Sequence, residues 1–142
     1  MDNSPLLNFH FQVDLGDSIA GFSEVSGLRA EHEILEYRSG SDKEYSTHKI
    51  PGLKKFSNLV LKRGVLKGDI DIFSWFNNVG LAVERRQVTI TLLDHNHEPT
   101  MIWIVKNAWP VRFTFSELNA LRSEILIESL ELAHEGIVVE SK

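Results

Sequence analysis

The sequence predicts a mainly β domain that carries a single helix. Three observations support this fold class. Residues 7–15 alternate strictly between apolar and polar side chains, and residues 87–105 contain two strand-like segments around a polar turn. Residues 69–80 combine helical spacing with a capping signal and form the one convincing helix. A chain of 142 residues buries one substantial core but is short for two ordinary domains, so we expect one domain over residues 1–142.

The first 38 residues predict three strands. In the first strand, over residues 7–15, the apolar side chains share one face, as in a half-buried strand. A turn is predicted at residues 16–18, where glycine, aspartate and serine follow one another. A short strand over residues 22–26 lies between two glycines, and a more polar extended segment follows over residues 28–38.

Residues 39–57 are predicted to form a long extended loop. They are rich in glycine, serine, lysine and aspartate, include Pro51-Gly52, and show neither a helical nor a strand period. Loops of this length are uncommon in compact domains, and they are often functional or become ordered against a partner. A strand follows over residues 58–66, with Arg63 interrupting its apolar side.

The one helix is expected over residues 69–80. Asp69 can accept hydrogen bonds from the free amides at its start, and Gly80 ends it. Its apolar face would be formed by Ile72, Phe73, Phe76 and Val79.

Two further strands are predicted over residues 87–93 and 100–105, joined by the turn at 94–99. The second strand is apolar on both faces, so either its sheet is covered on both sides or a neighbouring subunit covers it. The last third is ambiguous. Ser116 could cap a helix that carries Leu118, Leu121 and Ile125, but residues 125–132 are equally typical of a strand.

Charge is unevenly distributed along the chain. The net charge of -5 argues against nucleic-acid binding, which needs clustered lysine and arginine. Residues 38–67 nevertheless hold eight bases and two acids, a balance of +6. This basic segment could be a solvated face, a site for an anionic ligand or a loop that docks against another subunit.

The sequence offers little catalytic or metal-binding chemistry. The chain has no cysteine, and His95 and His97 lie in a polar turn where spacing indicates no third metal ligand. The motifs of acyl transfer, nucleotide hydrolysis and dinucleotide binding do not occur. We therefore expect no metal, no cofactor and no enzymatic activity.

The three tryptophans bear on ligand binding, and the hydropathy of the chain bears on its location. Trp75, Trp103 and Trp109 could form a carbohydrate-binding surface, but the first two lie in apolar segments, which favours core packing. No window reaches the roughly 18 apolar residues of a membrane helix, and the first residues lack the layout of a secretory signal. We expect synthesis in the bacterial cytoplasm and no membrane insertion.

A series of segments, in order from residue 8 to residue 136, resembles the tail tube family of contractile phages and phage-like contractile injection systems. These segments are Ala20-Gly21-Phe22-Ser23-Glu24-Val25-Ser26-Gly27-Leu28, Tyr37-Arg38, Lys49-Ile50-Pro51-Gly52-Leu53-Lys54-Lys55-Phe56, Asn58-Leu59-Val60-Leu61-Lys62-Arg63-Gly64, Asn107-Ala108-Trp109-Pro110-Val111, Leu118-Asn119-Ala120 and Glu128-Ser129-Leu130-Glu131-Leu132-Ala133-His134-Glu135-Gly136.

The resemblance implies two packed antiparallel sheets in a barrel-like body, flanked by the helix at 69–80 and carrying the long loop at 39–57. It favours a strand over residues 124–134. It also implies hexameric rings, similar to those of haemolysin co-regulated proteins, that stack into a hollow tube inside a contractile sheath. The loop would reach the adjacent ring, where its positive charge would complement acidic surface.

The residues expected at this subunit and ring-stacking interface are Arg38, Lys43, Tyr45, Lys49, Leu53, Lys54, Lys55 and Phe56. The implied partners are further copies of the chain, the sheath, baseplate and spike proteins, a tube-terminating cap, and a cargo effector or DNA in the lumen. The assembled product would be a phage virion tail or an extracellular injection particle. Two alternatives stay open, a tube-initiating paralogue in the baseplate and a β-barrel that binds a small ligand or a carbohydrate.

Overall fold

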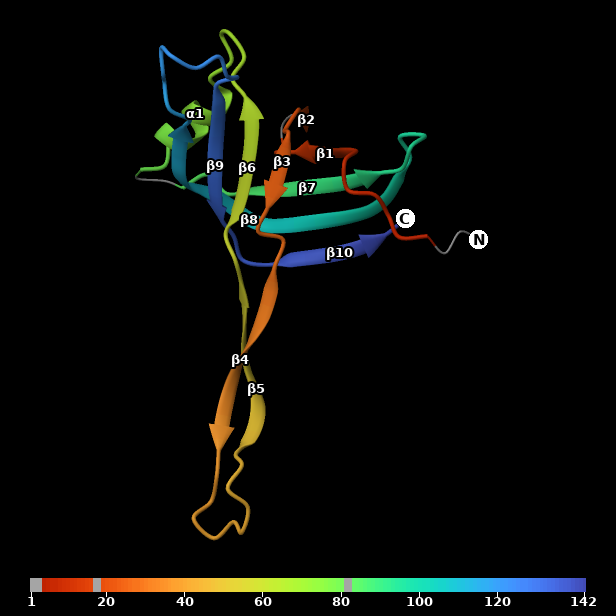
Figure 1. Ribbon diagram of the computed structural model, residues 1–142, viewed down its shortest axis with the longest axis vertical. Coiled ribbons are helices and arrows are strands. Elements are labelled where there is room, and N and C mark those ends of the chain that lie inside the picture. Colours follow the sequence, from red (N-terminus) through yellow and green to blue (C-terminus); the bar gives the residue numbers. More distant parts are fainter. Residues whose placement is uncertain (1–3, 17–18, 81–82) are drawn as a thin grey trace.

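A computed structural model describes residues 4–16, 19–80 and 83–142 (Figure 1). In these ranges the elements are β1 (Phe11–Asp14), β2 (Ile19–Ala20), β3 (Glu24–Ser26), β4 (Ala30–Tyr37), β5 (His48–Phe56), β6 (Leu59–Gly64), α1 (Asp71–Asn77), β7 (Arg86–Leu93), β8 (Pro99–Phe115), β9 (Ile127–Ala133) and β10 (Ile137–Ser141). The predicted mainly β class with one helix is confirmed. Within the described ranges, no helix is long and apolar enough to cross a membrane.

The body consists of two antiparallel sheets joined by the long strand β8. One sheet has the order β2-β1-β7-β8, with β10 on the other side of β8, and the second has the order β8-β9-β6-β3. Residues 99–108 of β8 pair with β7, whereas residues 109–115 pair with β9. Asn107, with φ at 52°, and a register shift after Pro110 lie near the change of partner. One strand thereby places two sheets around a common core.

The core follows from alternation in the central strands. Strand β6 buries Leu59, Leu61 and Arg63, and these residues pair across the sheet with Leu132, Leu130 and Glu128 of β9. The cluster is completed by side chains from both sheets and the helix: Val13, Leu15, Phe22, Ile72, Trp75, Val88, Ile90, Val105 and Ala108. Burial of this apolar surface is the main stabilisation of the body.

Arg63, which interrupts the apolar side of β6 in the sequence, is buried in an ion pair. Its Nε donates a hydrogen bond to Oε1 of Glu128 on β9, and its Nη2 lies 3.4 Å from Oδ1 of Asp69. The guanidinium also lies over the Phe22 ring, 5.6 Å from the centroid. The charge is tolerated in the core because acidic and aromatic partners surround it.

The helix is shorter than predicted, and the face that it buries matches the predicted one only in part. It covers residues 71–77 instead of 69–80, although Oδ1 of Asp69 accepts a hydrogen bond from the Asp71 amide at 3.3 Å. The buried residues are Ile72 and Trp75, while Phe73 is 42% exposed. Periodicity alone did not identify Trp75, whose indole donates a hydrogen bond to the Glu84 carbonyl at 3.1 Å.

The first strand is also shorter than predicted. Only residues 11–14 pair with β7, and Leu7 and Phe9 are exposed although they continue the alternation. The turn predicted at residues 16–18 extends into positions outside the described residues. Alternation therefore located the strand but overestimated its length, because pairing ends where the partner strand ends.

The largest correction concerns residues 39–57, which are not a continuous loop. Residues 48–56 form β5, which pairs with β4 in a separate two-stranded sheet. Every residue of β4 is exposed, so neither face needs an apolar row and the sequence shows no strand period. The remaining loop is limited to residues 38–47.

The ambiguous last third forms strands. Residues 127–133 are β9, as the family resemblance implied, and β10 was not predicted. Ser116 does not cap a helix: its amide donates a hydrogen bond to the Ile127 carbonyl, and its Oγ accepts one from the Ile127 amide at 2.9 Å. These two bonds close the loop at residues 116–126.

Candidate assembly surfaces at the two ends of the molecule

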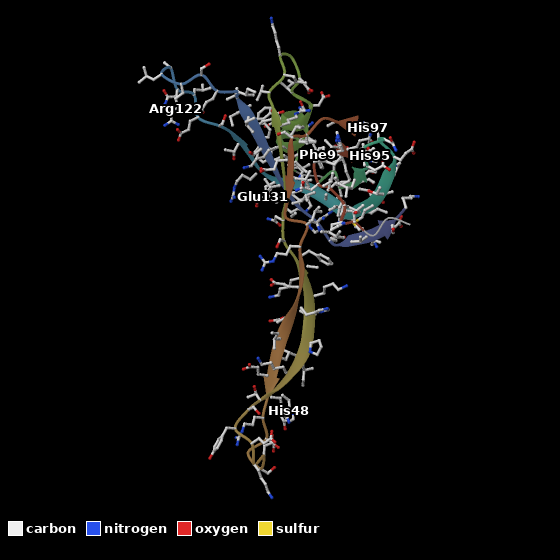
Figure 2. All side chains as sticks on the ribbon, turned by 45° about the vertical axis from the view of Figure 1, so that its right-hand side comes forward. Phe9, His48, His95, His97, Arg122 and Glu131 are labelled. Atoms are coloured by element: carbon white, nitrogen blue, oxygen red, sulfur yellow. The ribbon has the colours of Figure 1, made fainter. Side chains whose placement is uncertain are left out.

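The hairpin, defined as residues 30–56, projects from the body along the longest axis of the molecule (Figure 1). Strands β4 and β5 are in register from Ala30↔Phe56 to Tyr37↔His48, with a register shift between His32 and Ile34. His48 lies near the free end of the hairpin in Figure 2, whereas Arg122 lies at the opposite end of the molecule. The interface residues expected from the sequence all lie on this hairpin.

The hairpin separates its charges by strand. Strand β4 carries Glu31, Glu33 and Glu36, and strand β5 carries Lys49, Lys54 and Lys55. Glu31 lies opposite Lys55 and Glu36 opposite Lys49, while Lys55 Nζ lies 3.9 Å from Glu33 Oε1. One edge of the hairpin is therefore acidic and the other basic.

This pairing corrects the interpretation of residues 38–67 as a positive loop. Residues 30–56 hold five bases and five acids, so the hairpin has a net charge of zero. The sequence window that begins at residue 38 leaves out the glutamates of β4, which lie beside the lysines in space. Any electrostatic contribution to docking must come from the local arrangement of charge, because the hairpin has no net positive charge.

The tip, defined as residues 38–47, is ordered by its own hydrogen bonds. Arg38 Nε donates to the Glu44 carbonyl at 2.9 Å, and Nη2 donates to the Asp42 carbonyl at 3.0 Å. The Ser39 amide donates to Oδ2 of Asp42 at 3.0 Å. Arg38, expected at the interface, is thus engaged within the hairpin. The tip side chain of Tyr45 is 94% exposed.

The base of the hairpin is anchored on the loop between β9 and β10. The Phe56 ring lies 5.8 Å from the His134 ring. The Gly136 amide donates to Nδ1 of His134, so Nε2 carries the proton and donates to the Ser57 carbonyl at 2.7 Å. Phe56 is only partly exposed, so its ring anchors the base of the hairpin on the body.

Large apolar side chains are exposed along the whole hairpin. Apart from Tyr45 they are Ile34, Leu35, Tyr37, Ile50 and Leu53, of which Leu53 is 73% exposed. An isolated two-stranded hairpin is marginally stable in water, and exposed apolar groups of this size are typical of interaction surfaces. Leu53 is the expected interface residue with the clearest apolar contribution besides Tyr45.

The opposite end of the molecule exposes a second apolar set. It is formed by the loop after β6, helix α1, the end of β8 and the loop between β8 and β9. Its members are Leu66, Ile70, Phe73, Phe115, Leu118, Leu121 and Ile125. Leu118 and Leu121 are 86% and 96% exposed. Sequence reasoning missed this surface because Leu118, Leu121 and Ile125 were interpreted as the apolar residues of a possible helix.

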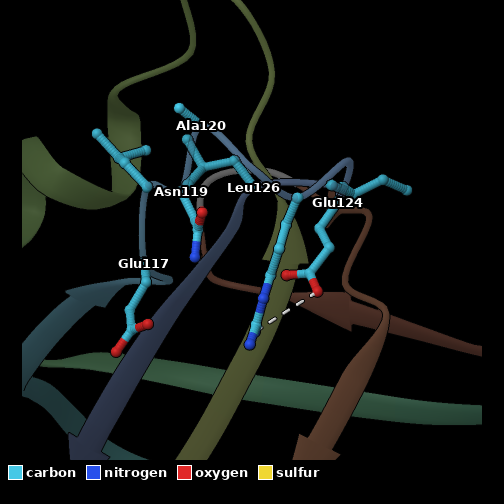
Figure 3. A pocket seen from close by; sticks show the side chains of 8 residues that line it. Glu117, Asn119, Ala120, Glu124 and Leu126 are labelled. Carbon is cyan, nitrogen blue, oxygen red and sulfur yellow. Dashed lines mark ion pairs between the residues drawn. The ribbon is translucent and has the colours of Figure 1, made fainter.

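A groove lies in the loop between β8 and β9 (Figure 3). It is lined by Glu117, Leu118, Asn119, Ala120, Arg122, Glu124, Ile125 and Leu126. Nη1 of Arg122 lies 4.0 Å from Oε1 of Glu124 in this groove, and the dashed line in Figure 3 marks this ion pair. The groove therefore combines exposed apolar side chains with two carboxylates and one guanidinium.

The other candidate sites do not assemble. His10 lies against His97, with ring centroids 4.9 Å apart, but the described residues contain no group of three or more histidine, cysteine or acidic side chains that could hold a metal. Trp75 is buried, and Trp103 packs against the core. This placement removes two of the three tryptophans from the proposed carbohydrate-binding surface.

The sequence of the chain matches a known protein family. The family described as T4-like virus tail tube protein gp19 matches residues 7–138. The chain belongs to this tail tube family. A comparison with curated proteins returns no match.

Solved structures of tube-containing particles match this tail tube protein over nearly its full length. A chain of the PVC extracellular contractile injection system, from the sheath-tube complex in the extended state, is 30% identical, with a TM-score of 0.91 over 99% of this chain and 94% of that one. A chain from the cap of the anti-feeding prophage is 28% identical, with a TM-score of 0.92 over 100% and 95%. Hcp1 from Flavobacterium johnsoniae, at 11% identity and a TM-score of 0.58 over 93% and 95%, shares the fold.

Proposed function

We propose that this chain is the repeating subunit of the inner tube of a contractile phage tail or phage-like injection particle. Its copies would form hexameric rings that stack into a hollow conduit for DNA or an effector. The observation that carries the proposal is the hairpin, a folded but almost wholly exposed element on a body that has its own core. Membership of the tail tube family supports the same role.

The two different apolar ends support a polar assembly that extends along one axis. The hairpin and the groove end are different surfaces at opposite ends of the long axis (Figure 1). A contact between unlike surfaces does not close on itself when it repeats along an axis, so it generates a filament. Lateral contacts would close each ring, and the hairpin residues Lys43, Tyr45, Lys49, Leu53, Lys54 and Lys55 would act between rings.

The surrounding partners follow from the matched particles. The sheath-tube complex of PVC and the terminating cap of the anti-feeding prophage supply the chains most similar in sequence among the structures compared above. We therefore expect a contractile sheath around the tube, a cap at one end, and a baseplate with its spike at the other. A structural role of this kind requires no catalytic residue.

Electron microscopy of the purified protein tests the proposal. Negative-stain images should show rings or tubes, and sedimentation should show growth with protein concentration. A chain that stays monomeric across concentration and salt would contradict the proposal. The number of copies per particle distinguishes a main tube subunit, present in many rings, from a baseplate initiator present in one.

A further inference from the structure

We propose that the tip of the hairpin docks into the groove of residues 117–126 on a second copy of the chain, in the next ring. Tyr45 would be the anchor that enters the groove, and Lys43 would face its carboxylates. This inference rests on the proposed function and names the acceptor surface that the hairpin uses.

The tip and the groove lie too far apart to meet within one subunit. The hairpin forms one end of the long axis and the loop between β8 and β9 lies at the other, as Figures 1 and 2 show. A contact between them must join two copies. Because each copy keeps one free tip and one free groove, the contact repeats along the axis without closing.

The tip carries a projecting aromatic side chain, and the groove carries exposed apolar side chains that could receive it. Tyr45 is 94% exposed on a tip held by the Arg38 hydrogen bonds, so its ring projects from an ordered loop. The groove is open to solvent, has a volume of about 530 Å³, and is lined by Leu118 and Ile125, which are 86% and 77% exposed. Aromatic side chains that enter such pockets supply much of the binding energy of protein interfaces.

The charges of the two surfaces are also complementary. Among the described residues, neither Lys43 nor Glu117 has an ion-pair or hydrogen-bond partner for its side chain. The groove carries Glu117 and Glu124 against Arg122 alone, a local balance of -1. Lys43 on the tip therefore has an unpaired carboxylate available on the groove, and this pair would favour one docking orientation.

Engineered cysteines provide a direct test, because the chain has no cysteine of its own. Ser46→Cys, on the tip beside Tyr45, and Ala120→Cys, in the groove lining, would be placed on separate chains, so that Tyr45 and Leu118 are retained. The two chains are then mixed, assembled and treated with a short bifunctional thiol reagent. The expected product is a covalent dimer that appears only in the mixture. A mixture of Ser46→Cys with Val139→Cys is the matched control, because Val139 is 56% exposed on β10, away from the groove.

The outcomes separate this inference from the proposed function. Tubes that form without a dimer between positions 46 and 120 would overturn the inference and leave the tube function standing. Dimers in the control mixture but not in the test mixture would also overturn it. If the unmodified chain forms neither rings nor tubes, the proposed function fails and the inference fails with it.

A charge exchange supplies a second test. Lys43→Glu and Glu117→Lys should each raise the protein concentration needed for tube formation about tenfold. Each ion pair contributes little, but every subunit at a junction between rings would lose one. The double variant should restore tube formation. Ring formation, followed by size-exclusion chromatography, should not change in any of them.

Lys106→Glu is the control for net charge, since Lys106 is an exposed lysine of the body. It should leave the concentration needed for tube formation unchanged. A Lys43→Glu/Glu117→Lys double variant that is as defective as the two single variants combined would show that these residues do not face each other.

Discussion

The body and the hairpin are built from the same antiparallel pairing, yet they bury very different fractions of their side chains. In the body, β6 and β9 bury every second residue against a shared core. In the hairpin, all eight residues of β4 are exposed. The body has the packing that stabilises a fold by itself, whereas the hairpin exposes the apolar surface that an assembly would cover.

The ion pairs of the two regions differ in the same way. Arg63 and Glu128 are buried in the body, each with a side chain about 6% exposed, whereas Lys55 and Glu33 in the hairpin are 58% and 43% exposed. Exposed pairs contribute little to stability, so those of the hairpin mainly favour one pairing register over others. Removing one member of the buried pair leaves an uncompensated charge in the core.

The largest effect is therefore expected from Arg63→Met. It should lower the free energy of unfolding by about 3–5 kcal/mol, because Glu128 is left buried without its partner. Urea denaturation below the assembly concentration measures the loss. The matched hairpin variant Lys49→Met, opposite Glu36, should cost less than about 1 kcal/mol. Equal losses of unfolding free energy in the two variants would show that burial does not make the Arg63–Glu128 pair more important for stability than the exposed pair.

A leucine in each region gives a second, apolar comparison. Leu61→Ala should lower the free energy of unfolding by about 2–5 kcal/mol, because Leu61 is fully buried and its truncation leaves a cavity. Leu53→Ala, at a position 73% exposed, should change it by at most about 0.5 kcal/mol. Instead, Leu53→Ala should reduce tube formation in sedimentation assays. A large loss of stability from Leu53→Ala would place the hairpin within the cooperative core.

The Lys54→Glu/Lys55→Glu double variant tests assembly with little effect on the fold. It changes the hairpin from a net charge of zero to -4 and makes the basic edge net acidic, because only Lys49 then remains there as a lysine. Circular dichroism should show a folded domain, and electron microscopy should show no tubes. Lys54→Gln/Lys55→Gln, which reaches only -2, should be intermediate. Normal tubes from the glutamate variant would exclude the basic edge from docking.

The smallest effect is expected in the turn between β7 and β8. Hydrogen bonds from the amides of Glu98 and Asn96 to the Asp94 carboxylate lower the pKa of Asp94, mainly through Glu98. A lowered pKa contributes stability that is present above the unfolded value of about 3.9 and is lost as the pH falls through the folded value. Titration followed by carbon NMR should give a midpoint below about 3.9, and a midpoint above it would contradict these bonds.

Predictions from the sequence succeeded where a strand has one buried face. The segments around residues 58–66 and 87–93 alternate because one face packs on the core, and both are strands. The helix was located but its buried face was only partly predicted, since Trp75 is buried in the core cluster that the strands of both sheets build. Strand β10 was missed because its residues 138–141 are exposed and give no periodic signal.

The candidate site was predicted only in part. The eight expected residues all lie on the hairpin, but Arg38 organises the tip and Phe56 anchors the base. The groove at residues 117–126 was not predicted. Its apolar residues indicate a binding surface only because they are exposed at the end opposite the hairpin, and this exposure is a property of the tertiary structure. Charge counted along the sequence was also misleading, since β4 neutralises β5 across the pair.

By itself, the sequence determined the mainly β class, the alternating core strands and the resemblance to tail tube proteins. These properties depend on local patterns, which each segment carries independently of the rest of the chain. Only the tertiary structure decided that β4 and β5 pair into a neutral hairpin and that this hairpin lies opposite an apolar groove. Those features depend on register and on contacts between distant residues. A strand that is exposed on both faces shows no alternation of apolar and polar residues, so its pairing cannot be predicted from the sequence.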